Sequence, residues 1–239
     1  RTLTSTRLAQ GKISRRLINE LGYGNASVFE KTIVTYTKPA YVHISIDCSG
    51  SMNGSRIASA IKTTMAICKA ATMISNLDVT VSLRSTYGSR PIVWMIYDST
   101  IHNLNRFANL MGIMHPSSST PESLCYEAIQ KDIKKAAQGR DSYFINFSDG
   151  EPAYSDSYIQ YHGEPAENHC RRMMNSLREQ NIKILSYFIS NKDGYGYDRS
   201  AAAFKNMYGK DASFIDVREL GSLSISLNKL FSNGEVVVC

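Results

Sequence analysis

Residues 41–53 read YVHISIDCSGSMN, a mostly apolar segment followed by a polar one. The first seven residues are mostly apolar and predict a buried strand that ends at Asp47. The next six, apart from Met52, are small or polar, which is typical of a loop, and a helix is predicted directly after them, at 54–75. A strand that leads through a polar loop into a helix is the beginning of a βαβ unit.

The rest of the chain alternates strands and helices in the same way. Apolar segments predict strands at 41–47, 78–84, 91–97, 142–148, 183–189 and 213–217. Helices are expected at 54–75, 121–138, 165–181, 198–208 and 220–231. The second and third strands are joined only by STYGSR, so they form a hairpin with one antiparallel edge strand. The pattern therefore predicts an α/β fold with a doubly wound, mostly parallel six-stranded sheet and helices on both faces.

Length and composition are those of a folded globular protein. The chain has 239 residues, of which 43 % are hydrophobic and 20 % are charged, enough to build a substantial core. Apolar residues recur at roughly helical spacing near the N-terminus, between many basic ones. We expect an N-terminal basic arm with a short helix at 1–38, followed by one α/β domain at 39–239.

Charge, cysteines and hydropathy restrict the partners and the location. The net charge of +6 comes without a long basic tract, so nucleic-acid binding is not expected from charge alone. The five cysteines form no metal-binding cluster in the sequence, which favours free thiols and a reducing compartment. No apolar run approaches the roughly 18 residues of a membrane span, and no signal-peptide core is present in the sequence given. We expect a cytoplasmic protein that makes no membrane contact.

Oxygen-bearing side chains gather where two strands end. In a doubly wound sheet ligands lie beyond the carboxyl ends of the strands, and Asp47 and Asp149 end strands that this topology places side by side. The candidate metal ligands are Asp47, Ser49, Ser51, Thr120 and Asp149. Carboxylates and hydroxyls suit a hard cation, so Mg²⁺ fits best, Mn²⁺ is possible, and zinc does not fit.

These residues resemble the von Willebrand factor A (VWA) domain and its metal-ion-dependent adhesion site, in which D-x-S-x-S is followed by a separate Thr and a later Asp. The resemblance covers about residues 40–231 and implies a Rossmann-like VWA fold. It also implies that Ser49, Ser51 and Thr120 contact the metal through hydroxyls, while Asp47 and Asp149 hold it directly or through water. An open metal position would then be completed by a carboxylate from a partner.

A narrower resemblance lies outside the metal motif. The segments TRLAQGK at 6–12, VF at 28–29, TPE at 120–122 and SDGEP at 148–152 are similar to the C-terminal domain of bacterial and phage CobT-like cobaltochelatase subunits. That resemblance implies a partner of the MoxR/CobS type, an AAA+ ATPase ring. It also implies that the chain is the non-ATPase subunit of a cobaltochelatase-type complex and is not catalytic alone.

Several other interpretations remain open. The Ser, Thr and Asp residues could serve only as strand-end caps and turn formers, and Glu151 could be an extra ligand or a solvated loop charge. No P-loop or G-x-S-x-G motif supports ATP hydrolysis or a serine nucleophile. Tyrosines at 154–162, with Tyr195 and Tyr197, suggest an aromatic rim for protein contact more than for nucleic acid. The alternative function is a stand-alone adhesion or nucleic-acid-binding VWA module.

Overall fold

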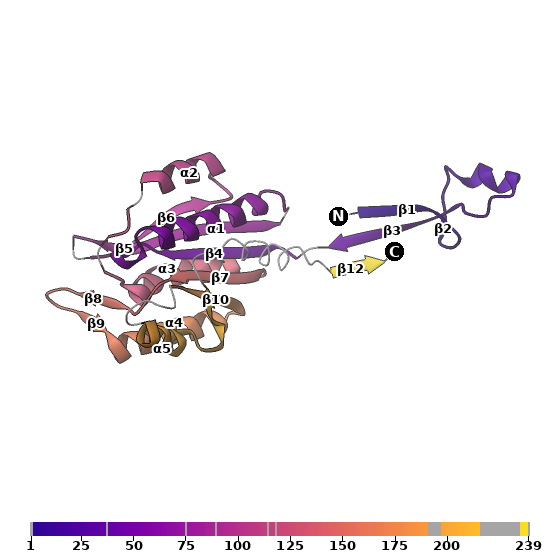
Figure 1. Cartoon of the computed structure of the whole chain (residues 1–239). Coiled ribbons are helices and arrows are strands. Elements are labelled where there is room, and N and C mark those ends of the chain that lie inside the picture. The colour runs from indigo at the N-terminus through magenta and orange to yellow at the C-terminus, as the bar shows by residue number, and fades with distance from the viewer. Residues whose placement is uncertain are drawn as a thin grey trace. The chain divides into compact units, whose positions relative to one another are not determined.

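The computed structural model describes residues 2–36, 38–74, 76–88, 90–113, 115–117, 119–190, 197–215 and 235–238. The helix expected at 220–231 lies outside these residues, as does the end of the strand expected at 213–217. The chain divides into two compact units, one made of Arg1–Lys38 and Phe231–Cys239 and the other of Pro39–Leu230 (Figure 1).

The smaller unit is built on an antiparallel sheet. Its central strand, β3 (Phe29–Tyr36), pairs with β1 (Thr2–Leu8), β2 (Lys12–Ile13) and β12 (Glu235–Val238). The helix described in this unit is η1 (Ile18–Tyr23), a 3-10 helix. The sequence pattern did not predict the strands, and two residues with apparent helical spacing, Leu8 and Ile13, lie in β1 and β2.

The larger unit contains a six-stranded sheet of order β11-β10-β7-β4-β5-β6, in which β6 alone is antiparallel to its neighbour. This confirms the predicted α/β fold, including the antiparallel edge. The strands are β4 (Ala40–Asp47), β5 (Leu77–Tyr87), β6 (Arg90–Asp98), β7 (Asp141–Ser148), β10 (Ile182–Ile189) and β11 (Ala212–Ile215). A short separate hairpin, β8 (Ala153–Ser155) and β9 (Gln160–His162), was not predicted.

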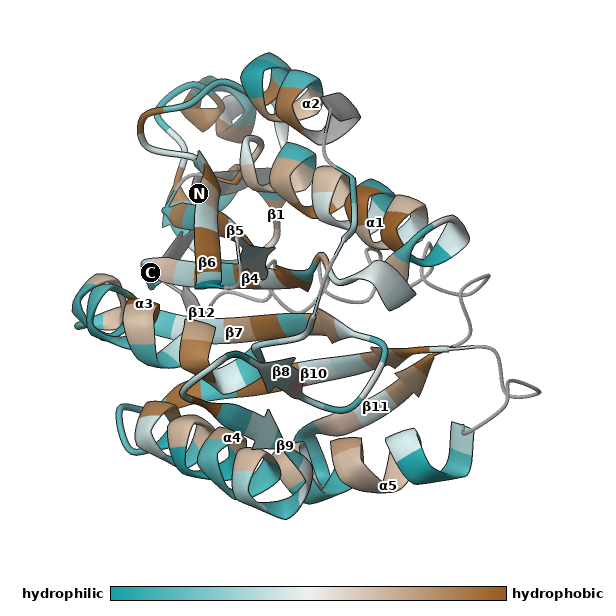
Figure 2. Cartoon of the chain, turned by 90° about the vertical axis from the view of Figure 1, so that its left-hand side faces the viewer, coloured by the Kyte–Doolittle hydropathy of each residue, from teal (hydrophilic) through white to brown (hydrophobic). Residues whose placement is uncertain are grey.

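Helices cover both faces of this sheet. They are α1 (Ser55–Ala71), α2 (Leu104–Ile113), α3 (Glu122–Ala137), α4 (Gly163–Arg178) and α5 (Tyr197–Tyr208). Side chains of α3, α4 and α5 share one core with Tyr41 and Phe144 of the sheet, while α1 packs on β4 and β5 and contacts α2. Figure 2 shows α1 and α2 on one side of the sheet and α4 and α5 on the other. None of the described helices has the length and apolar character that a membrane crossing requires.

The two central strands, β4 and β7, position the candidate site. Every residue of β4 after Ala40 is buried, as expected for a parallel strand covered on both faces. The strands run parallel, with Ile46 level with Phe147. Asp47 and Ser148 therefore end adjacent strands at the same edge of the sheet, as the sequence predicted.

Candidate metal site

A chain of hydrogen bonds joins the two carboxylates at this edge. Asp47 Oδ1 accepts a bond of 2.8 Å from the backbone amide of Ser49. The hydroxyls of Ser49 and Ser51 lie 3.1 Å apart, and Ser51 Oγ donates to Asp149 Oδ1 at 2.8 Å. The serines lie in and next to a single turn, η2 (Gly50–Met52), which turns the chain back toward α1. Four of the five predicted ligands are thus linked directly in space.

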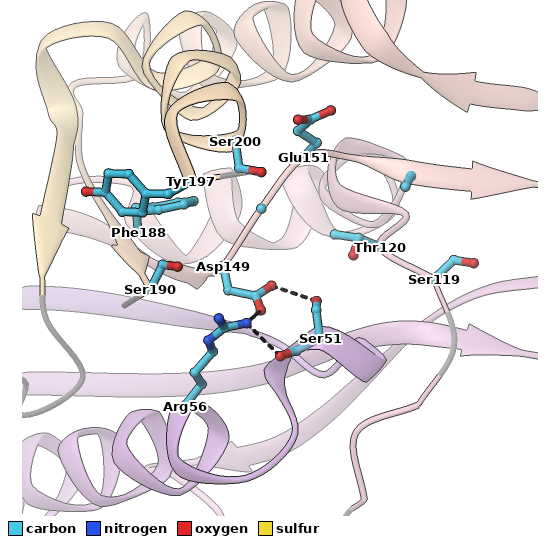
Figure 3. A pocket seen from close by; sticks show the side chains of 12 residues that line it. Ser51, Arg56, Ser119, Thr120, Asp149, Glu151, Phe188, Ser190, Tyr197 and Ser200 are labelled. Carbon is cyan, nitrogen blue, oxygen red and sulfur yellow. Dashed lines mark hydrogen bonds and ion pairs between the residues drawn. The ribbon is translucent and has the colours of Figure 1, made fainter. Parts of the chain in front are cut away.

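Thr120, the fifth predicted ligand, lines a pocket together with Ser51 of the serine loop. Its backbone forms an isolated β-bridge with Ala153, with hydrogen bonds of 2.9 and 3.0 Å, just before α3 begins. Thr120 lines the same pocket as Ser51 and Asp149, with a volume of about 440 Å³ (Figure 3). The pocket lining continues to Tyr197 and Ser200 of α5.

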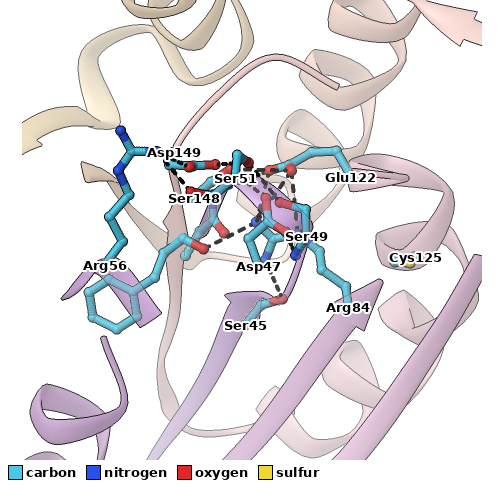
Figure 4. A network of polar contacts seen from close by, with 12 residues as sticks. Ser45, Asp47, Ser49, Ser51, Arg56, Arg84, Glu122, Cys125, Ser148 and Asp149 are labelled. Carbon is cyan, nitrogen blue, oxygen red and sulfur yellow. Dashed lines mark hydrogen bonds and ion pairs between the residues drawn. The ribbon is translucent and has the colours of Figure 1, made fainter. Parts of the chain in front are cut away.

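Beneath the loop lies a buried ion network that the sequence did not predict (Figure 4). Arg84, at 1 % exposure, donates to both carboxylate oxygens of Glu122 at 3.2–3.3 Å. Its Nη1 also donates to Ser45 Oγ at 3.0 Å, and its Nη2 lies 3.9 Å from Asp47 Oδ2. One arginine is therefore the counter-ion of two fully buried carboxylates. Buried charges require such pairing, because an unpaired charge away from water is costly.

Glu122 is the centre of this network. Besides Arg84, its carboxylate accepts hydrogen bonds from the hydroxyls of Tyr126 and Tyr208 and a longer bond from Ser148 Oγ. Ser148 Oγ lies 3.2 Å from Asp47 Oδ2 as well. The first turn of α3 and the last turn of α5 are in this way connected to the floor of the candidate site.

Burial governs the protonation of both site carboxyls. Burial raises the pKa of Asp47 to about 7, with Arg84 acting in the opposite direction and Glu122 and Asp149 adding to the rise. Burial also raises the pKa of Asp149, against the hydrogen bond from Ser51 and the charge of Arg56. A nearby positive charge favours the ionised form of both groups.

A second arginine contacts the site from the solvent side. Arg56 Nη1, from the first turn of α1, lies 2.6 Å from Asp149 Oδ2 and 2.9 Å from the carbonyl oxygen of Ser51. Glu151, which could have been an extra ligand, forms an ion pair of 3.1 Å with Arg199.

The donor set fits a hard divalent cation. The pocket presents the Asp149 carboxylate and the hydroxyls of Ser51 and Thr120, with Ser49 and Asp47 connected behind them, and such oxygen ligands suit Mg²⁺ and Mn²⁺. Among the residues that the structure describes, no group of three or more His, Cys, Asp or Glu side chains could hold a metal ion. Cys48, inside the loop, is 2 % exposed and packs inward.

The predicted aromatic rim is wrong in its main part. Tyr154 and Tyr161 are 3 % and 7 % exposed and pack around Ala166, so they anchor the β8–β9 hairpin. Tyr158 at the tip of the hairpin is 96 % exposed, and Tyr197 lines the pocket. Tyr195 lies outside the described residues.

Sequence reasoning missed three charged residues of the site: Arg56, Arg84 and Glu122 as an ion partner. The sequence did contain a signal for Arg84. It lies at the end of an apolar segment that predicts a buried strand, and a buried arginine needs a counter-ion. Glu122 directly follows Thr120 and Pro121, and its role in the network depends on a contact 38 residues away in sequence.

Comparison with known proteins gives a fold but no close relative. No family model matches the sequence, and no curated protein sequence matches it. Solved structures do match. The vWF domain of the type V pili tip protein Mfa5 from Porphyromonas gingivalis has a TM-score of 0.61 at 12 % identity, over 84 % of this chain and 99 % of that one.

Two further structures extend this likeness. The pilus adhesin SpaC from Lactobacillus rhamnosus GG matches with a TM-score of 0.60 at 12 % identity, over 84 % of this chain; the matched part spans about a third (31 %) of SpaC. Manganese-loaded Plasmodium vivax TRAP protein matches with a TM-score of 0.59 at 14 % identity, over 87 % of this chain and 80 % of that one. This chain therefore has the fold of von Willebrand factor A domains.

Proposed function

We propose that this chain is a protein-interaction module whose docking depends on Mg²⁺ or Mn²⁺ held by Asp47, Ser49, Ser51, Thr120 and Asp149. The observation that carries the proposal is that Ser51, Thr120 and Asp149 line one pocket at the carboxyl edge of a VWA-type sheet. Ser49 and Asp47 lie buried directly behind them and are joined to them by hydrogen bonds. Manganese-loaded TRAP, a protein of the same fold, supports the choice of cation.

The ligands suit docking better than catalysis. The hydroxyls of Ser49, Ser51 and Thr120 would contact the cation without neutralising it, and Asp47 and Asp149 would hold it directly or through water. When bound, the metal supplies positive charge at the pocket floor, which attracts a carboxylate from a partner. Within the described residues no histidine contacts the hydroxyl of Ser49 or Ser51; these hydroxyls contact each other, and Ser51 Oγ donates to Asp149.

The surface beside the pocket is suited to a protein partner. The hairpin that starts at Ala153 ends in a tip where Asp156 Oδ1 accepts 2.7 Å bonds from the amides of Tyr158 and Ile159. These two side chains are 96 % and 44 % exposed. Exposed aromatic side chains are enriched at protein interfaces, and a further tyrosine, Tyr197, lines the pocket itself.

The partner proposed from the CobT-like resemblance is an AAA+ ATPase ring of the MoxR/CobS type, inside the cytoplasm. In this proposal the ring hydrolyses ATP, and the chain holds a partner or substrate, including a role as the non-ATPase subunit of a cobaltochelatase-type complex. A second candidate, a stand-alone adhesion module, is favoured by the likeness to the pilus adhesin SpaC.

A thermal melt tests the metal site. A cation at about 100 times its Kd stabilises by about 2.7 kcal/mol, which corresponds to a rise of roughly 5–11 °C in Tm for a domain of this size. We expect that rise with Mg²⁺ and Mn²⁺ relative to EDTA, its loss in Asp149→Ala, and its retention in Asp132→Ala, which removes an exposed aspartate of α3. No shift in the wild-type protein would contradict the site.

A copurification tests the partner. The cognate ATPase should be recovered with the wild-type chain in Mg²⁺ and lost with EDTA or Asp47→Ala. Recovery of the ATPase that is unaffected by EDTA and by Asp47→Ala would contradict metal-dependent docking. Binding of RNA or DNA with a steep salt dependence, and no ATPase, would support the nucleic-acid alternative instead.

A further inference from the structure

Both oxygens of the Asp149 carboxylate are already engaged. Oδ1 accepts from Ser51 Oγ at 2.8 Å, and Oδ2 accepts from Arg56 Nη1 at 2.6 Å (Figure 3). The Asp149 side chain is 1 % exposed, so almost none of it faces water. A cation that binds Asp149 must therefore displace one of these two donors or share an oxygen with it.

The two donors differ in what their displacement costs. Ser51 can turn its hydroxyl hydrogen away and offer a lone pair to the same cation, because a hydroxyl both donates and accepts. Arg56 can only donate, and its positive charge repels a divalent cation placed on the same carboxylate. Arg56 is therefore the group that opposes metal binding.

Arg56 is also free to move, in contrast to Arg84. Arg84 is 1 % exposed and is fixed by Glu122, Ser45 and the carbonyl oxygen of Phe147. The side chain of Arg56 is 27 % exposed, and its partners in the described part of the chain are Asp149 and the Ser51 carbonyl. Its guanidinium can leave for water without leaving a buried charge unpaired, provided that a cation replaces it on Asp149.

We propose that Arg56 is an exchangeable internal counter-ion that competes with the divalent cation for Asp149 Oδ2 and so lowers the metal affinity of the site. This inference rests on the proposed metal site. In the metal-free protein the guanidinium neutralises Asp149. In the metal-bound protein it is released from the carboxylate into the solvent-facing part of the pocket.

Calorimetric titration of the full chain with MnCl₂ tests the competition. Arg56→Gln should bind Mn²⁺ about tenfold more tightly than the wild type, equivalent to about 1.4 kcal/mol. Arg56→Lys, which keeps the charge with a different geometry, should fall between them. Arg199→Gln is the matched control, since it removes an arginine charge beside the pocket from a residue paired with Glu151. Its affinity should stay within about twofold of the wild type.

The same substitution in a protein that lacks the Asp149 carboxylate shows whether the gain in Mn²⁺ affinity depends on that carboxylate. Asp149→Asn and the double variant Asp149→Asn/Arg56→Gln should bind Mn²⁺ equally weakly. Unchanged or weaker binding by Arg56→Gln, or a gain that persists without the Asp149 carboxylate, would overturn the inference and leave the metal site standing. If neither the wild type nor Arg56→Gln binds Mn²⁺, the proposed metal site fails and the inference fails with it.

Discussion

Replacing Arg84 by Met should strongly destabilise the larger unit. The change removes the guanidinium that serves Glu122 at 3.2–3.3 Å and Asp47 at 3.9 Å, and both carboxylates are 0 % exposed. Breaking a buried ion pair from one side costs about 3–5 kcal/mol, because the remaining charge stays buried without a counter-ion. At about 2–4 °C per kcal/mol, Tm should fall by roughly 6–20 °C.

The measurement is urea unfolding followed by the fluorescence of Trp94, the single tryptophan, which lies in β6 of the larger unit. Glu122→Gln and the double variant Arg84→Met/Glu122→Gln complete a double-mutant cycle. Because the double variant removes both members of the pair, it should be more stable than the sum of the single changes predicts, by about 1–3 kcal/mol.

The two outcomes that would refute this reasoning are specific. One is a loss of less than about 1 kcal/mol in Arg84→Met, since a surface pair would give that value. The other is additivity in the cycle, which would mean that Arg84 and Glu122 are stabilised by separate neighbours and not by each other.

Two further predictions concern other buried groups. His43, held between Thr80 and Ser82, has a pKa lowered to about 3 by burial and by Arg84. The neutral imidazole contributes its full stabilisation above the unfolded-state pKa. That contribution is lost as the pH falls, because the unfolded state takes up a proton that the folded state does not. From about pH 7 to about pH 5.5, the wild type should therefore lose about 1 kcal/mol more unfolding free energy than His43→Gln, and equal losses would contradict this. Burial raises the pKa of four free thiols, so a thiol reagent should leave them unmodified in native Cys239→Ser protein and modify all four after denaturation. These are Cys48, Cys68, Cys125 and Cys170.

The central sheet could be predicted because its signals are local. Apolar segments such as the one ending at Asp47 lie in strands that are buried on both faces. Because helices connect these strands, only a few sheet topologies are possible. The helix α2 was also locally encoded, by Leu104, Phe107 and Leu110 at a spacing of three and by Asn103, whose side chain accepts from the Arg106 amide. That signal is short, and it went unrecognised.

The sheet of the smaller unit could not be predicted in this way. β3 pairs with β1 nearby in sequence but also with β12, about 200 residues later, at Val34 and Val237. No local periodicity encodes a pairing between such distant segments, and the many basic residues of 1–38 obscured the alternation of the strands.

In the candidate site, too, some residues have local sequence signals and others do not. Four of its proposed ligands lie at or just after the ends of β4 and β7, and Thr120 lies just before α3, so the sequence alone could propose them as a group. Its arginines are found only in three dimensions, because Arg84 meets Glu122 across 38 residues and Arg56 meets Asp149 across 93. A short motif identifies the proposed ligand atoms. The arginines that neutralise the carboxylates lie far away in sequence and become neighbours only in the folded structure.

That balance bears on what a cation would do here. Two buried carboxylates at one edge of a sheet would repel each other, and a protein that relied on metal to neutralise them would depend on metal for folding. In this chain Arg84 serves Asp47 from the interior and Arg56 serves Asp149 from the solvent side. The carboxylates are therefore held in place by the protein's own cations. Folding would then not require metal, and a cation bound at the proposed site would add to the stability of a protein that is already folded.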